Sequence, residues 1–370
     1  MSICLRTGVP ILQKINEKTW DAVRLTEIFD TISRGKRIKK SDHIPGDFPY
    51  VSSTALTNGT DGSCGNEKNV RKFGDCLTIA NSGSVGSCFY HPYDFVASDH
   101  VTALSREGTS EDCYLGLSTL VGRLGEKYNF NREINDARIS REHIMLPLSD
   151  AGEPDYNYIE QYIRLKRSAL LTKYQCWVKT RIAELGETID IPQLNEMDWR
   201  AFVIKDIADV YSGHDIYAQE RVDGRTPLVT AVGTNNGIGY FVGNENDSRA
   251  EKSISVVRNG ASVGKAFYHK YSALYGNDCR RMKLKHSNSE FVNLFIAQMI
   301  GMQNKAFSYS RKLGTERLLN LRIMLPVTDD GTPDYEYMEQ YAKNLMLRKY
   351  KQYLAYLDSK EKTAPAAAND

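Results

Sequence analysis

The sequence predicts an α+β protein of two tandem homologous domains, each mostly β with short helices and each followed by one long helix. Three observations predict this fold class. The two halves of the chain repeat one another in order, short β-rich runs alternate with turn residues in each half, and a helical periodicity closes each half. We expect the two long helices to pair as an antiparallel coiled-coil spacer, with a pseudo-twofold axis between the domains.

The composition is that of an ordinary globular chain. Its 370 residues are 41% hydrophobic and 25% charged, which is enough for two or three domains. No segment approaches the roughly 20 apolar residues that span a bilayer, and the N-terminus has no signal-peptide core, so we expect a cytoplasmic protein without membrane contact. The seven cysteines are scattered, which is typical of reduced thiols. With a net charge of +2, a nucleic-acid partner must be argued from local clusters.

The repeat is the basis for two domains. The segment IMLPLSDAGEPDYNYIEQY from Ile144 returns as IMLPVTDDGTPDYEYMEQY from Ile323, and SVGSCFYH from Ser84 returns as SVGKAFYH from Ser262. WDAVRLTEIFDTISRG near the N-terminus likewise matches WRAFVIKDIADVYSG in the second half. Because the period is about 180 residues, far above the unit of a solenoid, the halves are tandem domains.

The sequence pattern changes from β-rich to helical at the same point of each half. β-rich runs such as CLTIA and SISVV precede the Leu-Pro. After it, Pro154 and Pro333 stand where proline starts a helix, and Asp155 and Asp334 are suited to cap the first turn. Apolar residues at three- and four-residue steps predict helices over about 155–185 and 334–358. The predicted organisation is a first domain over 1–153, a spacer helix over 154–186, a second domain over 187–332, and a second helix with a tail over 333–370.

Motifs for catalysis are scarce. There is no Asn/Asp-Pro-Pro-aromatic methyltransferase motif, no Pro-Asp followed by Glu-x-Lys of a nuclease, and no Walker pattern. The seven histidines show no metal-ligand spacing. His91 and His269 match across the halves, and we favour a structural role at a strand end for both. The sequence therefore predicts no catalytic and no metal site, and a stand-alone enzyme is the weakest hypothesis.

Local basic and polar loops carry the chemistry instead. SRGKRIKK in the first half is basic enough to neutralise several phosphates, although a solvated charged loop explains it as well. The matching SGHDIYAQER is much less basic, so phosphate anchoring is asymmetric or has moved. The candidates from these two segments are Arg34, Lys36, Arg37, Lys39, Lys40 and His214.

Further candidates lie in matched loops. Side chains of TALTNG and GTNNG are able to contact base edges, but Asn-Gly is also a hairpin turn signal. NSGSVG and RNGASVG are rich enough in glycine for a close backbone approach to DNA. The arginines before each final strand are suited to guanine or phosphate, and a structural salt bridge explains them equally well. These candidates are Ser53, Thr54, Asn58, Ser82, Ser84, Arg132, Arg138, Thr234, Asn235, Asn236, Arg258, Ser262, Lys265, Arg311 and Arg317.

Taken together, these motifs resemble the specificity subunit of type I restriction-modification systems, or the closely similar type IIB specificity subunit. The resemblance covers nearly the whole chain, and its two-copy arrangement is more specific than any single motif. It implies two target-recognition domains that each read half of a split site on double-stranded DNA. It also implies a non-catalytic chain without a cofactor of its own.

The implied partners would perform the chemistry. The resemblance implies two methyltransferase subunits, or fused methyltransferase-nuclease subunits, with S-adenosylmethionine bound in the partner and a restriction subunit as a further option. From the residues alone, a paired adaptor or a carbohydrate-type binding protein is the alternative function.

Overall fold

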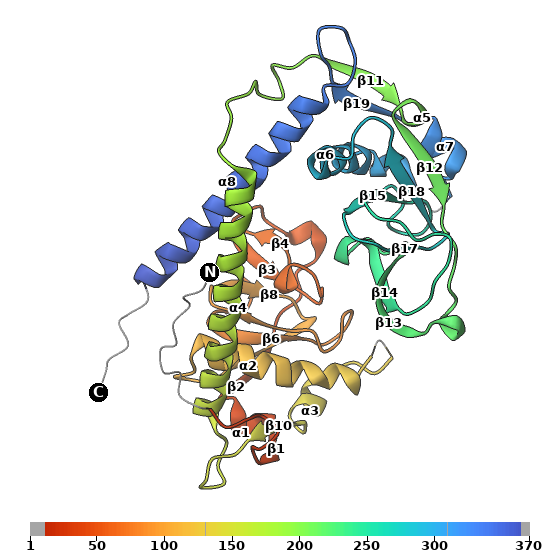
Figure 1. The fold of residues 1–370 in the computed structure, drawn as a ribbon. Helices are drawn as coiled ribbons and strands as arrows, with labels where there is room; N and C mark the ends of the chain where they lie inside the picture. Colours follow the sequence, from red (N-terminus) through yellow and green to blue (C-terminus); the bar gives the residue numbers. More distant parts are fainter. Residues whose placement is uncertain (1–11, 130, 309, 364–370) are drawn as a thin grey trace. The chain divides into compact units, whose positions relative to one another are not determined.

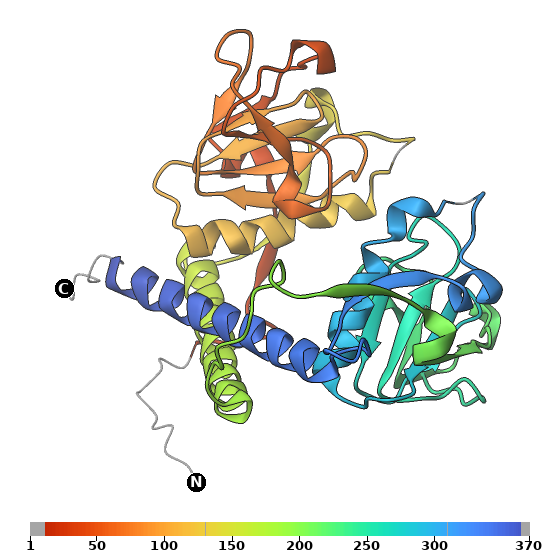
Figure 2. The ribbon, with the colours of Figure 1, turned by 90° about the horizontal axis from the view of Figure 1, so that it is seen from above.

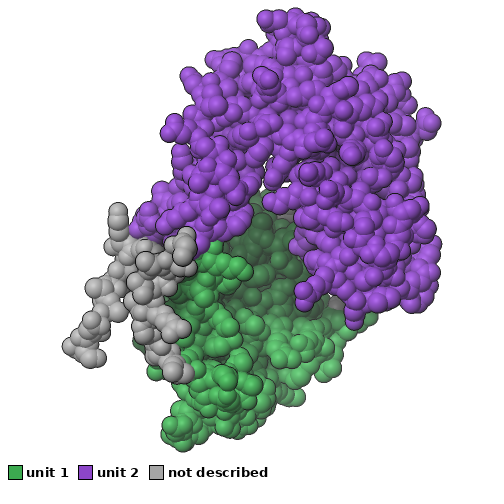
Figure 3. All heavy atoms as spheres, in the orientation of Figure 1, with its two compact units in different colours: residues 1–174 green, residues 175–370 purple. Residues whose placement is uncertain are grey.

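A computed structural model of the chain describes residues 12–129, 131–308 and 310–363, apart from the side chains of Lys40 and of residues 361–363. The chain divides into two compact units, residues 1–174 and 175–370, which Figure 3 distinguishes by colour. None of the described helices combines the length and the apolar character that crossing a membrane requires.

Unit 1 contains three sheets (Figure 1). A two-stranded antiparallel sheet brings Trp20 opposite Pro147, so the start of the domain is tied to its last strand. The sheets, in their spatial order, are β1 (Trp20–Arg24) with β10 (His143–Pro147); β2 (Thr31–Arg34), β9 (Val101–Ser105), β6 (Cys76–Ala80) and β7 (Cys88–His91); and β4 (Thr60–Cys64), β3 (Phe48–Val51), β8 (Phe95–Ala97) and β5 (Lys72–Phe73).

The described part of unit 2 repeats this topology, except that its third sheet has three strands where that of unit 1 has four. Trp199 lies opposite Pro326, as Trp20 lies opposite Pro147. Its sheets are β11 (Trp199–Val203) with β19 (Arg322–Pro326); β12 (Ala208–Ser212), β18 (Cys279–Leu284), β15 (Ser253–Val257) and β16 (Ala266–His269); and β14 (Ile238–Val242), β13 (Asp223–Val229) and β17 (Leu274–Tyr275). The repeat seen in the sequence is therefore a repeat of the fold.

Short helices connect and cover the sheets of each unit. In Figure 2 the yellow-orange α2 lies along one side of the unit 1 sheets, and it packs against β6 and β7. The helical elements of unit 1 are α1 (Leu25–Ile28), η1 (Lys40–Asp42), η2 (Thr57–Gly59), α2 (Glu111–Gly122), η3 (Arg123–Glu126) and α3 (Asp136–Ile139). Those of unit 2 are α5 (Ile204–Ile207), η4 (Ala218–Glu220), η5 (Asn235–Gly237), α6 (Glu290–Gly301), η6 (Asn304–Ala306) and α7 (Thr315–Leu319).

The central strands β6 and β15 are buried at every position, as expected for their apolar or small residues. The cores of the two units are built around them. In unit 1, the β6 residues Leu77 and Ile79 join Leu117 of α2 in one cluster. In unit 2, Ile254 and Val256 of β15 join Ile296 of α6 in an equivalent cluster.

The long helices α4 (Tyr156–Leu185) and α8 (Tyr335–Thr363) follow the two domains as the sequence predicts. Asp155 accepts a hydrogen bond from the Tyr158 N–H, and Asp334 accepts one from the Tyr337 N–H, both at 2.9 Å, which confirms the predicted capping. The second helix continues beyond residue 358 over charged residues that favour helix. This continuation has no apolar stripe, so periodicity placed the end too early.

The first turns of both helices pack on their own domain, which the sequence does not predict. Ile159 of α4 is 6% exposed and belongs to the unit 1 core. A Cβ on Gly116 of α2 would lie 2.3 Å from Cγ2 of Ile159. The missing side chain of this glycine therefore allows α4 to approach α2. In unit 2, Met338 of α8 is fully buried in the equivalent core.

Within unit 2, the end of α4 contacts α8. The Trp177 and Tyr350 rings meet edge to face at 5.6 Å, and Asn344 exchanges hydrogen bonds with the backbone of Ile189 after the helix. As the chain advances from Trp177 to Ile189, its partner residues on α8 go back from Tyr350 to Asn344, which is the antiparallel order. Pairing along the whole length of both helices stays a prediction.

Candidate nucleic-acid interface

In unit 1, hydrogen bonds join loops that are far apart in the sequence into one group, here called the first loop cluster. It comprises residues 34–37, 52–58, 81–84, 98–100 and 131–138. The Ser84 N–H donates to the Ser53 carbonyl at 3.0 Å, the Asn81 N–H to the His100 carbonyl at 2.8 Å, and the Ile134 N–H to the Asn81 carbonyl at 3.0 Å. Most of the sequence-predicted residues of this half are therefore neighbours.

In unit 2, an equivalent group forms the second loop cluster. It comprises residues 212–214, 230–236, 258–262, 276–278 and 311–317. Leu313 N–H donates to the Arg258 carbonyl at 3.0 Å, and Arg258 N–H donates to the Asp278 carbonyl at 2.9 Å. The Lys265 ammonium donates to the Gly233 carbonyl at 2.9 Å, which ties two further loops together. The duplication thus extends from the strands to the loops.

Two equivalent glycines explain how the loops come so close. A Cβ on Gly35 would lie 2.1 Å from the Ser98 carbonyl oxygen, and a Cβ on Gly213 would lie 2.1 Å from the Gly276 carbonyl oxygen. Both glycines directly follow the first strand of the central sheet. The residue type at the Ser-Arg-Gly and Tyr-Ser-Gly positions is therefore dictated by packing.

The asparagines of the two Asn-Gly candidates have a structural role in turns. Asn58 and Asn236 have φ of 55° and 54°, in the left-handed region where asparagine is tolerated. Their side-chain amides donate to the carbonyls of Tyr90 at 3.1 Å and Tyr268 at 3.2 Å. The turn interpretation thus explains both amides, while the neighbouring Thr234 and Asn235 are exposed.

The small polar side chains of the glycine-rich loops differ in availability. Ser82 is 7% exposed and its hydroxyl lies 2.6 Å from Nδ1 of His100. Thr54 accepts a hydrogen bond from the Leu56 N–H at 3.1 Å, which shapes the turn. Ser53, Ser84 and Ser262 are partly exposed. Of these, the partly exposed serines remain the better candidates for contact with a ligand.

The matched arginines are exposed charged groups of the loop clusters. Arg138 donates to the Glu133 carbonyl at 2.5 Å, and Arg317 donates to the Lys312 carbonyl at 2.7 Å. Both side chains are exposed, and no carboxylate within the described part forms an ion pair with either. The salt-bridge alternative is thus unsupported there, and most of their guanidinium donors face solvent.

The aromatic-arginine pair is also repeated. Arg132 lies over the Tyr128 ring at 5.2 Å and Arg311 over the Phe307 ring at 6.0 Å. Such stacking holds a guanidinium plane in place while its donors stay available.

The basic segment of unit 1 is extended by a residue that the sequence interpretation missed. Arg71 donates to the Arg34 carbonyl at 2.5 Å. Lys36, Arg37 and Lys39 are exposed, and the side chain of Lys40 lies outside the described part. Nothing local in the sequence connects Arg71 to Arg34. They meet because the Arg71 carbonyl accepts from the Ala97 N–H, while the Ala97 carbonyl accepts from the Lys36 N–H. In unit 2 the matching His214 faces Asp247 at 3.2 Å instead.

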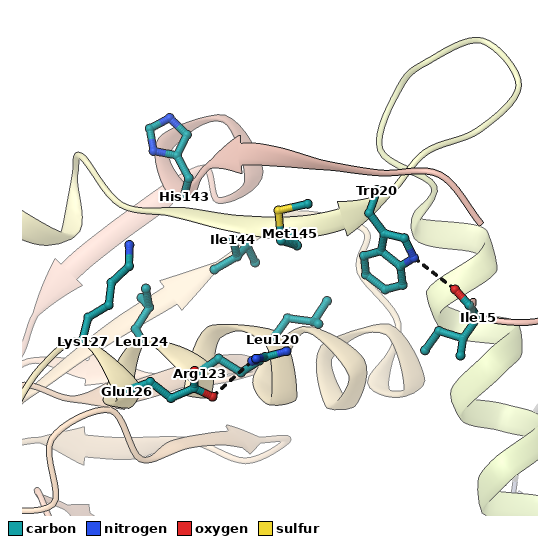
Figure 4. Close-up of a pocket in the computed structure, with 10 residues that line it drawn as sticks. All are labelled: Ile15, Trp20, Leu120, Arg123, Leu124, Glu126, Lys127, His143, Ile144 and Met145. Atoms are coloured by element: carbon teal, nitrogen blue, oxygen red, sulfur yellow. Dashed lines mark hydrogen bonds and ion pairs between the residues drawn. The ribbon is translucent and has the colours of Figure 1, made fainter. Parts of the chain in front are cut away.

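Outside the loop clusters, a depression of unit 1 lies between β1, β10 and α2 (Figure 4). Its lining is mainly apolar, and the Trp20 indole N–H donates to the Ile15 carbonyl at 3.2 Å. The polar residues at its edge include Arg123 and Glu126, which pair with each other at 3.3 Å. This arrangement offers no nucleophile with an adjacent base.

The matched histidines are core residues. His91 and His269 are fully buried, and their Nε2 atoms lie 2.8 Å from the hydroxyls of Thr78 and Ser255. Burial lowers the pKa of each imidazole to about 4. Both are therefore neutral hydrogen-bonding groups inside the sheet.

The chain belongs to the family of type I restriction modification DNA specificity domains, which matches it twice, over residues 17–173 and 196–353. It is thus a specificity subunit of restriction-modification systems with two recognition domains.

Among individual proteins, it is similar to the BcgI specificity subunit of a type II restriction enzyme from Heyndrickxia coagulans. The two are 27% identical over 86% of this chain and 92% of that protein.

Two solved structures are also similar to this chain. The S subunit of a type I restriction-modification system from M. genitalium is 16% identical over 95% of this chain and 96% of its own, with a TM-score of 0.48. The HsdS subunit of Thermoanaerobacter tengcongensis is 15% identical over 92% and 91%, with a TM-score of 0.29.

Proposed function

We propose that the chain reads a bipartite DNA site, one half-site with each loop cluster, and performs no catalysis itself. The proposal is carried by one observation: homologous loop clusters, each with an exposed and unpaired arginine, occur at equivalent places of two domains. Arginine donates two hydrogen bonds to guanine or to a phosphate, so the same position is suited to base or backbone contact. The recognition domains of this proposal span 1–153 and 187–332, with spacer helices over 154–186 and 333–370.

Two linked recognition domains fix the gap between the half-sites. One turn of B-DNA spans about 10 base pairs, so domains on a rigid spacer contact two short segments and leave the bases between them unread. Phosphate contacts supply affinity and base contacts supply specificity. We assign the remaining site candidates of the loop clusters to either phosphate contacts or base contacts.

The chemistry is assigned to partner subunits. Methylation requires a base to be flipped into a pocket beside the methyl donor, and the sequence carries no methyltransferase motif that would build one. We therefore assign S-adenosylmethionine binding and base flipping to methyltransferase partners. The similarity to a type II specificity subunit over 92% of its length favours a partner that fuses methyltransferase and nuclease. Co-purification of the chain with each partner arrangement from its own gene neighbourhood tests this.

Two arginine substitutions test DNA recognition. Arg138→Ala and Arg317→Ala in the complete complex are each expected to relax sequence preference in one half-site only, by about 1–3 kcal/mol per lost base contact. Arg123→Ala is the matched control, since this exposed arginine lies outside the first loop cluster. Selection of bound duplexes from a random pool reads both half-sites at once. Unchanged preferences in both variants would exclude the arginines.

The same assay separates the proposal from the alternative of an adaptor or carbohydrate-binding protein. A DNA reader retains random-sequence duplex at low salt and loses it steeply as salt rises. A chain that ignores duplex under both conditions would favour the alternative.

A further inference from the structure

In each unit, an arginine side chain donates a hydrogen bond to a backbone carbonyl at the equivalent position of the fold. The two arginines come from different strands. In unit 1, Arg34 of β2 donates from Nε to the Asp99 carbonyl at 2.6 Å. In unit 2, Arg280 of β18 donates from Nη1 to the Asn277 carbonyl at 2.9 Å. Asp99 and Asn277 are equivalent, because each directly follows the residue whose carbonyl contacts Gly35 or Gly213.

The same cross-strand pair of residues occurs in both units, and the arginine is on one strand of the pair in unit 1 and on the other strand in unit 2. In unit 1, Arg34 lies opposite Thr102. In unit 2, Ser212 takes the place of Arg34 and lies opposite Arg280. In unit 2, the first strand thus carries a serine where unit 1 has the arginine, and the neighbouring strand carries an arginine where unit 1 has a threonine. Such compensation is expected when the position of the guanidinium matters more than the strand that supplies it.

The buried arginine of unit 2 is not neutralised. Arg280 is 5% exposed. Its hydrogen-bond acceptors among the described residues are all neutral: the Thr315 hydroxyl at 2.7 Å, the carbonyls of Asn277 and Cys279, and the Asn277 amide oxygen. No carboxylate of the described part lies within ion-pair distance of its guanidinium. Burying a charge without a counterion is unfavourable, so protein stability does not account for this residue.

A second arginine stands beside it. Burial, followed by repulsion from the Arg258 guanidinium, lowers the pKa of Arg280. The Nε of Arg258 is itself buried without a hydrogen-bond partner among the described residues. Its nearest carboxylate is Asp278 at 3.8 Å, which is half exposed. Asp278 is within ion-pair distance of Arg258 but not of Arg280, so two neighbouring guanidinium groups have one carboxylate beside them and positive charge is in excess.

Unit 1 has a comparable pair. Arg71 donates to the Arg34 carbonyl and lies 3.4 Å from the Ser33 hydroxyl. Arg34 and Arg71 line one open depression, together with Asp30 and Asp136. Neither arginine forms an ion pair within the described residues, although these two carboxylates lie in the same depression.

We propose that the pairs Arg34 with Arg71 and Arg280 with Arg258 each bind one backbone phosphate of the DNA. Arg34 and Arg280 belong to the matched cross-strand pair, and their second arginines come from different loops. This deepens the proposed function and rests on it. A phosphate supplies an anion to Arg34, Arg71 and Arg280, which form no ion pair within the described residues, and guanidinium groups bind it through two parallel hydrogen bonds. The unequal charge of the two segments SRGKRIKK and SGHDIYAQER then has a physical reason: the second domain supplies its phosphate contact from β18.

Exchange of the cross-strand pair tests this inference. The probes are a random-sequence duplex and the duplex selected by the wild-type complex. Arg280→Thr is expected to weaken binding at least about tenfold, since it removes a charge-assisted hydrogen bond to the phosphate. It is also expected to reduce the slope of log K against log salt by about 0.9, the contribution of one phosphate. Adding Ser212→Arg to Arg280→Thr rebuilds the unit 1 arrangement and is expected to restore both values.

Matched variants keep the test decisive. Lys283→Thr removes a charge from the exposed face of the same strand and is expected to leave the slope unchanged. If Arg280→Thr does not fold, Arg258→Ala, a less buried change, decides by the same salt slope. A folded variant with the wild-type slope, or a folded double variant without recovery, would overturn the inference. If the wild-type complex itself does not bind duplex, the proposed function fails first.

Discussion

The buried histidines make the stability of both domains sensitive to mild acid. His91 and His269 are fully buried, and burial lowers their pKa to about 4, whereas an unfolded histidine titrates at about 6.5. Between these values the unfolded state binds a proton that the folded state does not. Stability is therefore complete above about pH 6.5 and is lost as the pH falls toward 4.

The magnitude follows from the two pKa values. A difference of about 2.5 pH units corresponds to about 3 kcal/mol per histidine when the transition is complete, and to about 2 kcal/mol at pH 5. Each unit is therefore expected to lose about 2 kcal/mol of its free energy of unfolding between pH 8 and pH 5 through its buried histidine. Any loss from the titration of carboxylates adds to this value.

Denaturant unfolding of the wild type and of His91→Gln at both pH values measures this loss. Glutamine can still hydrogen-bond the Thr78 hydroxyl, but it cannot be protonated. The variant is therefore expected to lose about 2 kcal/mol less than the wild type on acidification. His143→Gln is the control, because this histidine is exposed in the same unit. An equal loss in His91→Gln and in the wild type would refute the assignment of a buried, neutral imidazole.

Three further predictions concern contacts that shape the domains. Gly35→Ala is expected to destabilise unit 1 by about 1–3 kcal/mol through overpacking, and an unchanged thermal midpoint would contradict the close contact with Ser98. Asn58→Ala is expected to cost about 1 kcal/mol, since the turn loses its hydrogen bond to Tyr90; denaturant midpoints measure it. Burial raises the pKa of Asp155, but hydrogen bonds from Lys18 and the Tyr158 N–H outweigh it, and the pKa is lowered. Asp155→Asn should thus show its full loss of stability above about pH 4 and a progressively smaller loss as the pH falls further. An equal loss at neutral and at strongly acidic pH would exclude the charged cap.

The arrangement of domains was predictable because the sequence repeats itself. Trp20 and Trp199, which open the repeat, begin equivalent strands that pair with the segments around Ile144 and Ile323. Long helices were predictable from their periodicity and from the capping residue Asp155. The burial of Ile159 on its own domain was not predictable, because it depends on the missing Cβ of Gly116 on a different helix.

The candidate site was predictable only in part. Matched loops pointed to Arg138 and Arg317, and the structure leaves both guanidinium groups exposed. Arg280 escaped notice because alignment of the halves pairs it with a threonine, and only strand register shows that it takes the place of Arg34. Asn58 was ambiguous in the sequence for a physical reason, since an Asn-Gly turn and a base-reading loop require the same residues.

The half-sites that the chain selects from DNA test the central claim most directly. We propose sequencing duplexes that the complete complex retains from a random pool, together with the methylated positions in the source genome. Two short motifs at one fixed spacing are predicted, and Arg138→Ala and Arg317→Ala should each degrade a different one. A single uninterrupted motif, or half-sites at freely varying spacing, would contradict recognition by two domains on a rigid spacer.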